Sequence, residues 1–158
     1  MRLTTKGRYA VTAMLDLAIH GNDRAVALNE IAARQGISQA YLEQLFARLR
    51  RGGLVTSTRG PGGGYRLSRE AQAIAVADVI EAVDEDIDAT RCAGARNCQD
   101  EDRCLTHDLW ADLSEHIARF LGGVSLDDLS RRESVRQVAR RQACKVAGSE
   151  PVRFVNMP

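Results

Sequence analysis

Four potential metal ligands lie within sixteen residues of the chain: Cys92, Cys98, Cys104 and His107. Thiolates and imidazoles bind zinc, copper and iron–sulfur clusters, and four such side chains can complete one coordination sphere. The residues between them are mostly charged or polar and cannot build an apolar core, so a bound metal centre is what would order this segment. Cys104 and His107 flank the expected start of a helix, where free backbone amides favour a thiolate. The sequence therefore predicts a metal or redox site.

The spacing leaves two kinds of metal centre open. Three Cys and one His form a common structural zinc set, but zinc loops usually separate paired ligands by two to four residues. Here five residues separate each pair of successive cysteines, which suits a wider group such as a two-iron cluster with Cys and His ligands. Cys144 stands 40 residues beyond Cys104 and is expected to be a free thiol. No Ser/His/Asp or Cys–His nucleophile arrangement is present, so we do not expect an enzyme.

Charge is distributed unevenly along the 158 residues, although the net charge is only +1. Residues 1–75 carry 11 Lys and Arg against 5 Asp and Glu, whereas residues 76–118 carry 3 against 12. A basic N-terminal half suits contact with nucleic-acid phosphates. The N-terminus has no apolar signal-peptide region, and no stretch approaches the roughly 20 apolar residues of a membrane span. We expect a cytoplasmic protein, in which cysteines serve as ligands rather than as disulfides.

The N-terminal half has the pattern of a helix-turn-helix. A first helix is expected over residues 6–20, capped by Thr4 or Thr5, and a short second helix over residues 29–35. Ser38 then caps a third helix that extends to about residue 51, with its apolar side chains on one face (Leu42, Leu45, Phe46 and Leu49). In a helix-turn-helix, the second of the paired helices enters the major groove of DNA by its N-terminal residues.

A glycine-rich hairpin follows directly. Strand-like segments at residues 54–57 and 65–67 flank the loop from Thr58 to Gly64. The loop lacks the Gly-Lys-Ser/Thr ending of a phosphate-binding P-loop, and no helix follows it closely, which favours a hairpin tip. Behind a helix-turn-helix this hairpin is expected to be a wing, where Arg59 can contact phosphate or a minor groove.

The predicted DNA contacts come from the N-terminus, the third helix and the wing. Gln39 and Gln44 are of the type that pairs with adenine, and Glu43 can accept a hydrogen bond from the amino group of cytosine. The full set is Arg2, Thr4, Lys6, Ser38, Gln39, Ala40, Tyr41, Glu43, Gln44, Arg59, Gly60, Pro61 and Gly62.

The C-terminal half is expected to contain a dimerisation helix. After a helix at residues 76–84, the acidic and cysteine-containing segment is expected to be irregular, and the longest late helix follows over residues 106–121. Its apolar stripe needs a partner surface, for which a second copy of the chain is the simplest candidate. The stripe consists of Leu109, Trp110, Leu113, Ile117, Phe120 and Leu121. Ser125 caps a brief turn at 126–129, and the basic tail from residue 131 to residue 158 is expected to be mobile.

These patterns predict a mostly α fold with a small β-hairpin wing: a winged helix-turn-helix plus a long dimerisation helix. The expected divisions are a DNA-binding domain at residues 1–84, a cluster-binding loop at 85–105, a dimerisation region at 106–130 and a flexible tail at 131–158.

The chain resembles the winged-helix iron–sulfur cluster regulators of the IscR family. The matching stretches are residues 1–10, residues 37–46, the hairpin of residues 54–65, and the cysteine segment with Val83-Asp84-Glu85 before it. They cover about residues 1–130, and the tail lies outside them. The resemblance implies a homodimeric transcription regulator that binds operator DNA with two half-sites and holds a [2Fe–2S] cluster through Cys92, Cys98, Cys104 and His107.

By the same resemblance, the expected role is feedback control of cluster-assembly genes, with cluster-assembly proteins as donors of the cluster. The alternative is a zinc-stabilised winged-helix repressor without redox sensing.

Overall fold

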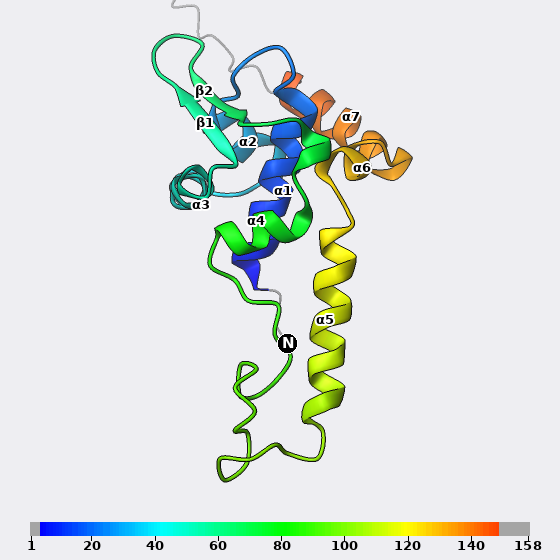
Figure 1. Ribbon diagram of the computed structural model, residues 1–158. Helices are drawn as coiled ribbons and strands as arrows, with labels where there is room; N and C mark the ends of the chain where they lie inside the picture. Colours follow the sequence, from blue (N-terminus) through cyan, green and yellow to red (C-terminus); the bar gives the residue numbers. More distant parts are fainter. Residues whose placement is uncertain (1–3, 149–158) are drawn as a thin grey trace, which may run out of the picture.

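The computed structural model describes residues 4–148 of the chain. A helical body carries a two-stranded wing at one end, and the long helix α5 projects from it beside an extended loop (Figure 1). The elements are α1 (Thr5–His20), α2 (Leu28–Gln35), α3 (Gln39–Arg51), β1 (Val55–Thr58), β2 (Gly64–Leu67), the short 3-10 helix η1 (Ala71–Ala73), α4 (Val76–Ala82), α5 (His107–Gly122), α6 (Leu126–Ser130) and α7 (Glu133–Ala147). Within the described residues, none of the helices combines the length and apolar character needed to cross a membrane.

The helix-turn-helix is formed as predicted. Ser38 caps α3, with its Oγ accepting a hydrogen bond from the backbone N–H of Tyr41 at 3.3 Å. Gly36 ends α2 in the left-handed conformation at φ 66°, which glycine adopts without steric cost. The four predicted apolar residues of α3 are all buried in the core. Local capping and one apolar face therefore fix the orientation of α3 on the body.

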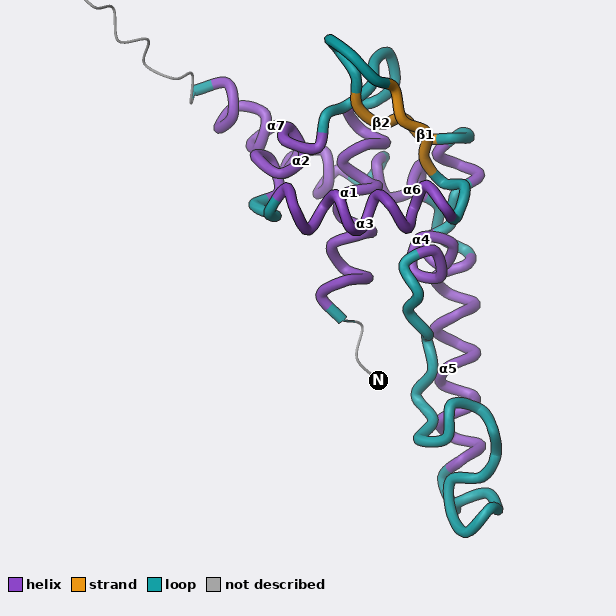
Figure 2. Tube along the Cα trace, turned by 90° about the vertical axis from the view of Figure 1, so that its left-hand side faces the viewer, coloured by secondary structure: helices purple, strands orange, loops and turns teal. Residues whose placement is uncertain are grey.

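The wing is an antiparallel hairpin in which Val55 pairs with Leu67 and Thr58 with Gly64. The connector between α1 and α2 holds its base, because Val26 and Tyr65 exchange backbone hydrogen bonds of 2.9 and 2.8 Å. A Cβ at Gly64 would collide with the backbone of Val26, so this close approach requires glycine. Figure 2 shows the hairpin standing beyond one end of α3.

The core joins the N-terminal helices to the segment that follows α5. Phe46, Met14, Leu17 and Ile31 are fully buried, and so is Leu126 of α6. Backbone hydrogen bonds from Leu126 N to Ile74 O (3.0 Å) and from Val76 N to Val124 O (2.9 Å) attach the C-terminal end of α5 to the body. The N-terminal end of α5 and the loop of residues 86–106 before it, here called the cysteine loop, thus project away from the core (Figures 1 and 2).

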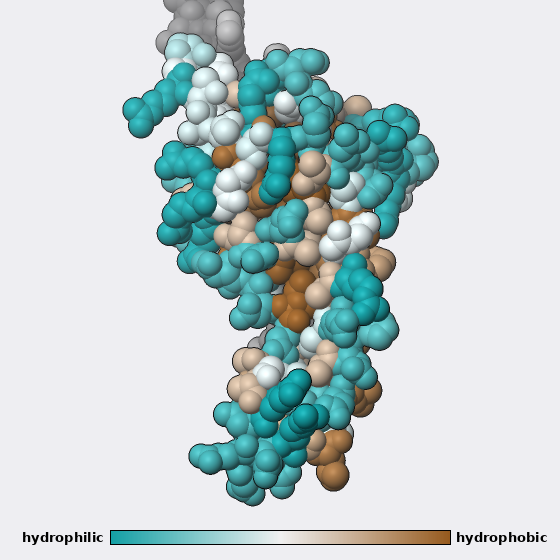
Figure 3. All heavy atoms as spheres, viewed as in Figure 1, coloured by the Kyte–Doolittle hydropathy of each residue, from teal (hydrophilic) through white to brown (hydrophobic). Residues whose placement is uncertain are grey.

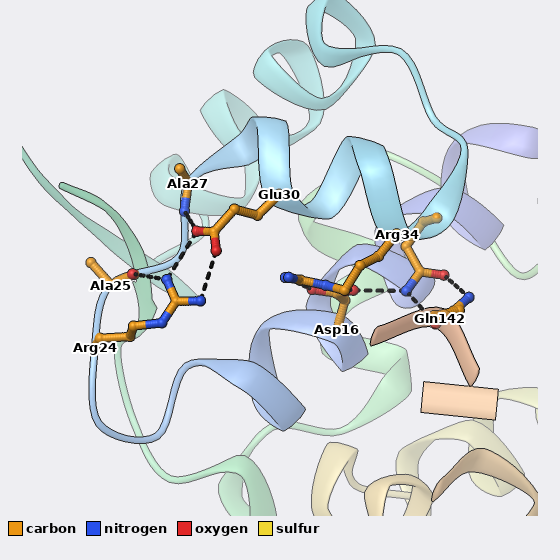
Figure 4. A network of polar contacts seen from close by, with 8 residues as sticks. Asp16, Arg24, Ala25, Ala27, Glu30, Arg34 and Gln142 are labelled. Carbon is orange, nitrogen blue, oxygen red and sulfur yellow. Dashed lines mark hydrogen bonds and ion pairs between the residues drawn. The ribbon is translucent and has the colours of Figure 1, made fainter. Parts of the chain in front are cut away.

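The tail that was expected to be mobile contains a helix, α7, over residues 133–147, which the sequence pattern did not predict. This helix packs beside α2, where the side-chain amides of Gln35 and Gln142 exchange hydrogen bonds of 3.1 and 3.0 Å (Figure 4). Among its described residues none is fully buried. The half-buried residues Val135, Ala139 and Gln142 form the side of α7 that faces the body, so apolar and polar side chains both take part in this contact. Residues 149–158 of the predicted tail lie outside the described residues.

Candidate metal centre and nucleic-acid interface

Three of the four predicted ligands converge in the structure. The Nδ1 atom of His107 lies 3.5 Å from the Sγ of Cys92 and 3.6 Å from the Sγ of Cys98. The ligand atoms of these three residues all lie within 4.8 Å of one another. His107 is the first residue of α5 and is only 4% exposed. The long helix therefore presents the imidazole to the loop.

Cys104 lies beside this trio rather than within it. Its backbone N–H donates a hydrogen bond to the Sγ of Cys98 at 3.1 Å, and its own Sγ lies 3.9 Å from the Oγ1 of Thr106. The loop therefore brings together Cys92, Cys98 and His107 and holds the fourth predicted ligand next to them.

The loop backbone is unusual because four non-glycine residues in it have positive φ. Ala93, Arg96, Asp100 and Glu101 have φ values of 49°, 60°, 46° and 68°. Residues other than glycine adopt this left-handed backbone conformation at an energetic cost. Strained residues of this kind cluster at functional sites. A loop with this geometry is suited to being ordered by a group bound between its thiols.

Hydrogen bonds attach the first part of the loop, residues 88–94, to the side of α5 and to itself. The Oγ of Ser114 accepts a hydrogen bond from the backbone N–H of Ala89 at 2.8 Å. The Oδ1 of Asp88 accepts another from the N–H of Thr90 at 2.6 Å, and the Oγ1 of Thr90 accepts one from the N–H of Gly94 at 2.8 Å. The segment just before Cys92 is therefore attached to the middle of the long helix.

The loop shifts the pKa values of its three thiols in different directions. Desolvation raises the pKa of Cys92, but hydrogen bonds from the backbone N–H groups of Arg96 and Asn97 and from Thr90 outweigh it, and the pKa falls to about 6. A hydrogen bond with Cys98 lowers the pKa of Cys104. The backbone N–H of Cys104 stabilises the Cys98 thiolate, yet the neighbouring thiols raise the pKa of Cys98 overall. The site therefore favours the thiolate form at Cys92 and Cys104 and disfavours it at Cys98, where a bound cation would offset the repulsion between neighbouring thiolates.

The donor set fits a thiophilic metal centre. Sulfur and imidazole nitrogen are the ligands of zinc and of iron–sulfur clusters, whereas magnesium and calcium require oxygen ligands. An open cavity of about 690 Å³ adjoins the site, lined by Cys98, Cys104, His107 and Trp110 among others. This room and the nearby fourth thiol suit a group larger than a single ion.

The predicted base-reading side chains lie on the exposed face of α3. Gln39, Ala40, Glu43 and Gln44 are exposed, and the Nε2 of Gln39 donates a hydrogen bond to Glu43 at 3.3 Å. Tyr41 is half-buried, with its ring edge-to-face against Tyr9 at a centroid distance of 5.9 Å.

The other predicted DNA contacts lie at the wing tip and at the start of α1. Arg59, Gly60, Pro61 and Gly62 are exposed in the hairpin turn. Thr4 caps α1 by accepting a hydrogen bond from the N–H of Lys6 at 3.2 Å. Arg2 lies outside the described residues.

The apolar stripe of α5 is exposed in the single chain. Leu109 and Phe120 are 59% and 65% exposed, Trp110 and Leu113 are also exposed, and Ile117 and Leu121 are half-buried. Figure 3 shows apolar surface along the projecting part of the molecule. Exposed apolar stripes of this kind are typical of protein–protein contact surfaces.

Two ion pairs in the described structure were not anticipated from the sequence. Asp16 and Arg34 join α1 to α2 in the interior, and Asp84 and Arg48 join the end of α4 to α3. Neither pair has a sequence signal, because each connects residues that are far apart in the chain.

Comparison with known proteins agrees with this arrangement. The Rrf2 family, described as iron-dependent transcriptional regulators, matches residues 3–132. The HTH-type transcriptional regulator IscR of Xenorhabdus nematophila is 63% identical over 142 residues, covering 90% of this chain and 87% of that protein. The IscR of Yersinia enterocolitica is 56% identical over 160 residues, covering 99% and 98%. The similarity thus extends beyond about residue 130, the limit of the resemblance predicted from the motifs.

Solved structures show the same fold. The T. potens IscR structure has a TM-score of 0.68 at 39% identity, covering 82% of this chain and 85% of that one. CymR, the global cysteine regulator of B. subtilis, has a TM-score of 0.72 at 32% identity, covering 82% and 96%. The predicted winged-helix fold is confirmed, and the relatives are regulators rather than enzymes, as expected. The chain belongs to the Rrf2 family of iron-dependent transcriptional regulators and is of the IscR type.

Proposed function

We propose that the chain is a homodimeric sensor of iron–sulfur cluster status that controls cluster-assembly genes. The observation that carries this proposal is the convergence of Cys92, Cys98 and His107, with Cys104 beside them, in a loop attached to a winged-helix body. The basic N-terminal half and the exposed polar face of α3 support DNA as the partner. Cluster-assembly proteins would supply the cluster, and the protein would act in the cytoplasm.

A [2Fe–2S] cluster would be held by Cys92, Cys98, Cys104 and His107, and when bound it supplies a redox-sensitive and removable centre. His107 makes this ligand set weaker than four thiolates would, because a protonated imidazole cannot bind metal. The strained backbone of the loop supports a change of conformation when the cluster binds, because the left-handed residues can then relax to less strained conformations.

DNA recognition would use α3 and the wing. Ser38, Gln39, Ala40, Tyr41, Glu43 and Gln44 would face the major groove, and the Arg59–Gly62 tip would meet the backbone or the minor groove. The stripe of α5 would pair two subunits and so set the spacing of the two half-sites.

A zinc-stabilised repressor without redox sensing is the second candidate. It is favoured by one observation: the three converging ligand atoms lie within 4.8 Å of one another, a spacing that a single small ion can satisfy. In that case the site would be a structural clip, and DNA recognition would not respond to redox conditions.

The test measures DNA recognition with the cysteine site filled and empty. Anaerobic reconstitution with ferrous iron and sulfide should change the relative affinities of wild-type protein for a panel of genomic promoter fragments. Cys92→Ala should lose this response, and Cys144→Ala should retain it, because Cys144 lies exposed on α7, away from the site. An identical preference with and without the cluster in the wild-type protein would refute redox sensing and favour the zinc clip.

A further inference from the structure

Asp84 occupies a backbone position that favours glycine. It follows α4 directly after Val83 and has φ 55°, while its N–H donates to the carbonyl of Glu81 at 3.0 Å and the N–H of Glu85 donates to Ile80 at 3.2 Å. Helices commonly end with a glycine in this left-handed conformation, because a side chain there is strained. Aspartate adopts this conformation at some energetic cost. We therefore ask what the aspartate side chain does here that a glycine could not do.

The carboxylate of Asp84 pairs with the guanidinium of Arg48 on α3, the helix expected to read DNA. The carbonyl oxygen of Asp84 accepts a hydrogen bond of 3.0 Å from the Nζ of Lys6, at the start of α1. Asp84 is thus attached to two cations from elements that are expected to face DNA.

The next residue is pressed against α1. A Cβ at Gly7 would collide with the Oε2 of Glu85, and the Oε1 of Glu85 is buried with no hydrogen-bond partner among the described residues. Cys92 follows only eight residues after Asp84. The Asp84–Glu85 segment is therefore the junction where the cysteine loop leaves the winged-helix body (Figures 1 and 2).

The ion pair between Asp84 and Arg48 is open to exchange. The side chain of Arg48 is 38% exposed and that of Asp84 is 73% exposed, and ion pairs in such surroundings contribute little to stability. A cavity of about 500 Å³ between α3 and α4 adjoins Arg48 and gives its long side chain room to move. A DNA phosphate is also a strong partner for a guanidinium, so it can compete with the carboxylate.

We propose that Asp84 regulates DNA affinity by competing with a DNA phosphate for Arg48. With the carboxylate in place, Arg48 is neutralised and contributes no phosphate contact. A change in the cysteine loop that displaces Asp84 releases the guanidinium to the DNA backbone. The exchange itself is a property of the winged-helix body, and only its control by the loop depends on the proposed sensing function.

The test is the salt dependence of binding to a mixed-sequence duplex, measured by fluorescence anisotropy with metal-free protein. Asp84→Gly relieves the backbone strain and removes the carboxylate, so the variant should fold, and Asp84→Asn serves as a second variant that also tolerates the left-handed conformation. Each subunit that gains one phosphate contact should steepen the plot of log affinity against log salt by about 0.9. The variant should also bind more tightly than wild-type protein at low salt.

The matched control is Glu81→Gln. Glu81 lines the same cavity but forms no ion pair among the described residues, so this substitution removes a nearby charge without breaking an ion pair. It should leave the slope unchanged, and Asp84→Gly combined with Arg48→Gln should return the slope to the wild-type value. A wild-type slope for both Asp84 variants, or a steeper slope that survives Arg48→Gln, would overturn the proposal.

The link to the cysteine loop is measured separately with cluster-reconstituted protein. If filling the site steepens the wild-type slope but does not change that of Asp84→Gly, both the exchange and its control by the loop are supported. If filling has no effect on the slope of wild-type protein while Asp84→Gly still binds with the steeper slope, the exchange stands and its control by the loop fails; the sensing function itself fails only if the preference among promoter fragments is also unchanged.

Discussion

The buried ion pair between Asp16 and Arg34 should be essential for the stability of the helix-turn-helix. Its side chains are 0% and 7% exposed, and the guanidinium donates two hydrogen bonds to the carboxylate, at 2.9 and 2.7 Å. The Nε2 of Gln35 donates a third, at 2.7 Å, to the same carboxylate (Figure 4). Because Gln35 also pairs with Gln142, one carboxylate organises the contact between α1, α2 and α7.

Replacing Asp16 by Ala would leave the charge of Arg34 buried and unpaired. Breaking a buried pair in this way costs about 3–5 kcal/mol, because the remaining ion has lost both its partner and its hydration. For a chain of this size, that loss lowers Tm by roughly 10 °C. The assay is urea denaturation followed by circular dichroism, with Asp23→Ala as the matched control, since Asp23 is exposed on the connector after α1.

Replacing both partners distinguishes the stability lost with the ion pair itself from the cost of leaving the charge of Arg34 buried and unpaired. Asp16→Leu combined with Arg34→Met removes the two charges together, so it should recover most of the stability lost in Asp16→Ala. A cost below about 1 kcal/mol for Asp16→Ala, or a double replacement as unstable as the single one, would show that burial does not make this pair critical for stability.

Three further predictions concern sequence reading, assembly and acid stability. Glu43→Ala should broaden the set of bound sequences by removing a discrimination of about 1–3 kcal/mol; unchanged preference in a selection from random duplexes would exclude this role. Leu113→Glu, in the exposed stripe of α5, should yield monomers in analytical ultracentrifugation, and an intact dimer would place the interface elsewhere. A hydrogen bond from Arg24 lowers the pKa of Glu30 from 4.5 to about 2. Ionised Glu30 therefore contributes about 1 kcal/mol to the free energy of unfolding, after allowance for its exposure. This contribution is present at neutral pH and is lost as the pH falls from 4.5 towards 2. Glu30→Gln should therefore be less stable than wild-type protein at pH 7 and equally stable near pH 2; an equal difference at both values would contradict the assignment.

The winged helix could be predicted from sequence because local features determine it. The Ser38 cap, the spacing of Leu42, Leu45, Phe46 and Leu49, and the glycine-rich hairpin each act within a few residues. The position of His107 at the start of α5 was also predictable, since the apolar stripe that defines this helix begins just after it.

The parts that escaped prediction depend on distant contacts. Helix α7 has only a narrow apolar side, formed by Val135, Val138 and Ala139, and its Gln142 meets Gln35 across 107 residues of sequence. The Asp84 conformation could not be inferred because aspartate carries no turn signal as strong as glycine, and the helix expected to extend to residue 84 ends at Ala82. The placement of Cys104 beside the trio depends on loop geometry that spacing does not define.

The first measurement to make is the visible absorption spectrum of protein purified without oxygen, together with iron, sulfide and zinc analysis, because it shows whether the cysteine loop holds an iron–sulfur cluster. We expect a red-brown protein with the broad visible bands of thiolate-bound iron and with two irons and two sulfides per chain, and we expect Cys92→Ala to lose the colour. A colourless protein that retains one zinc per chain would contradict this expectation.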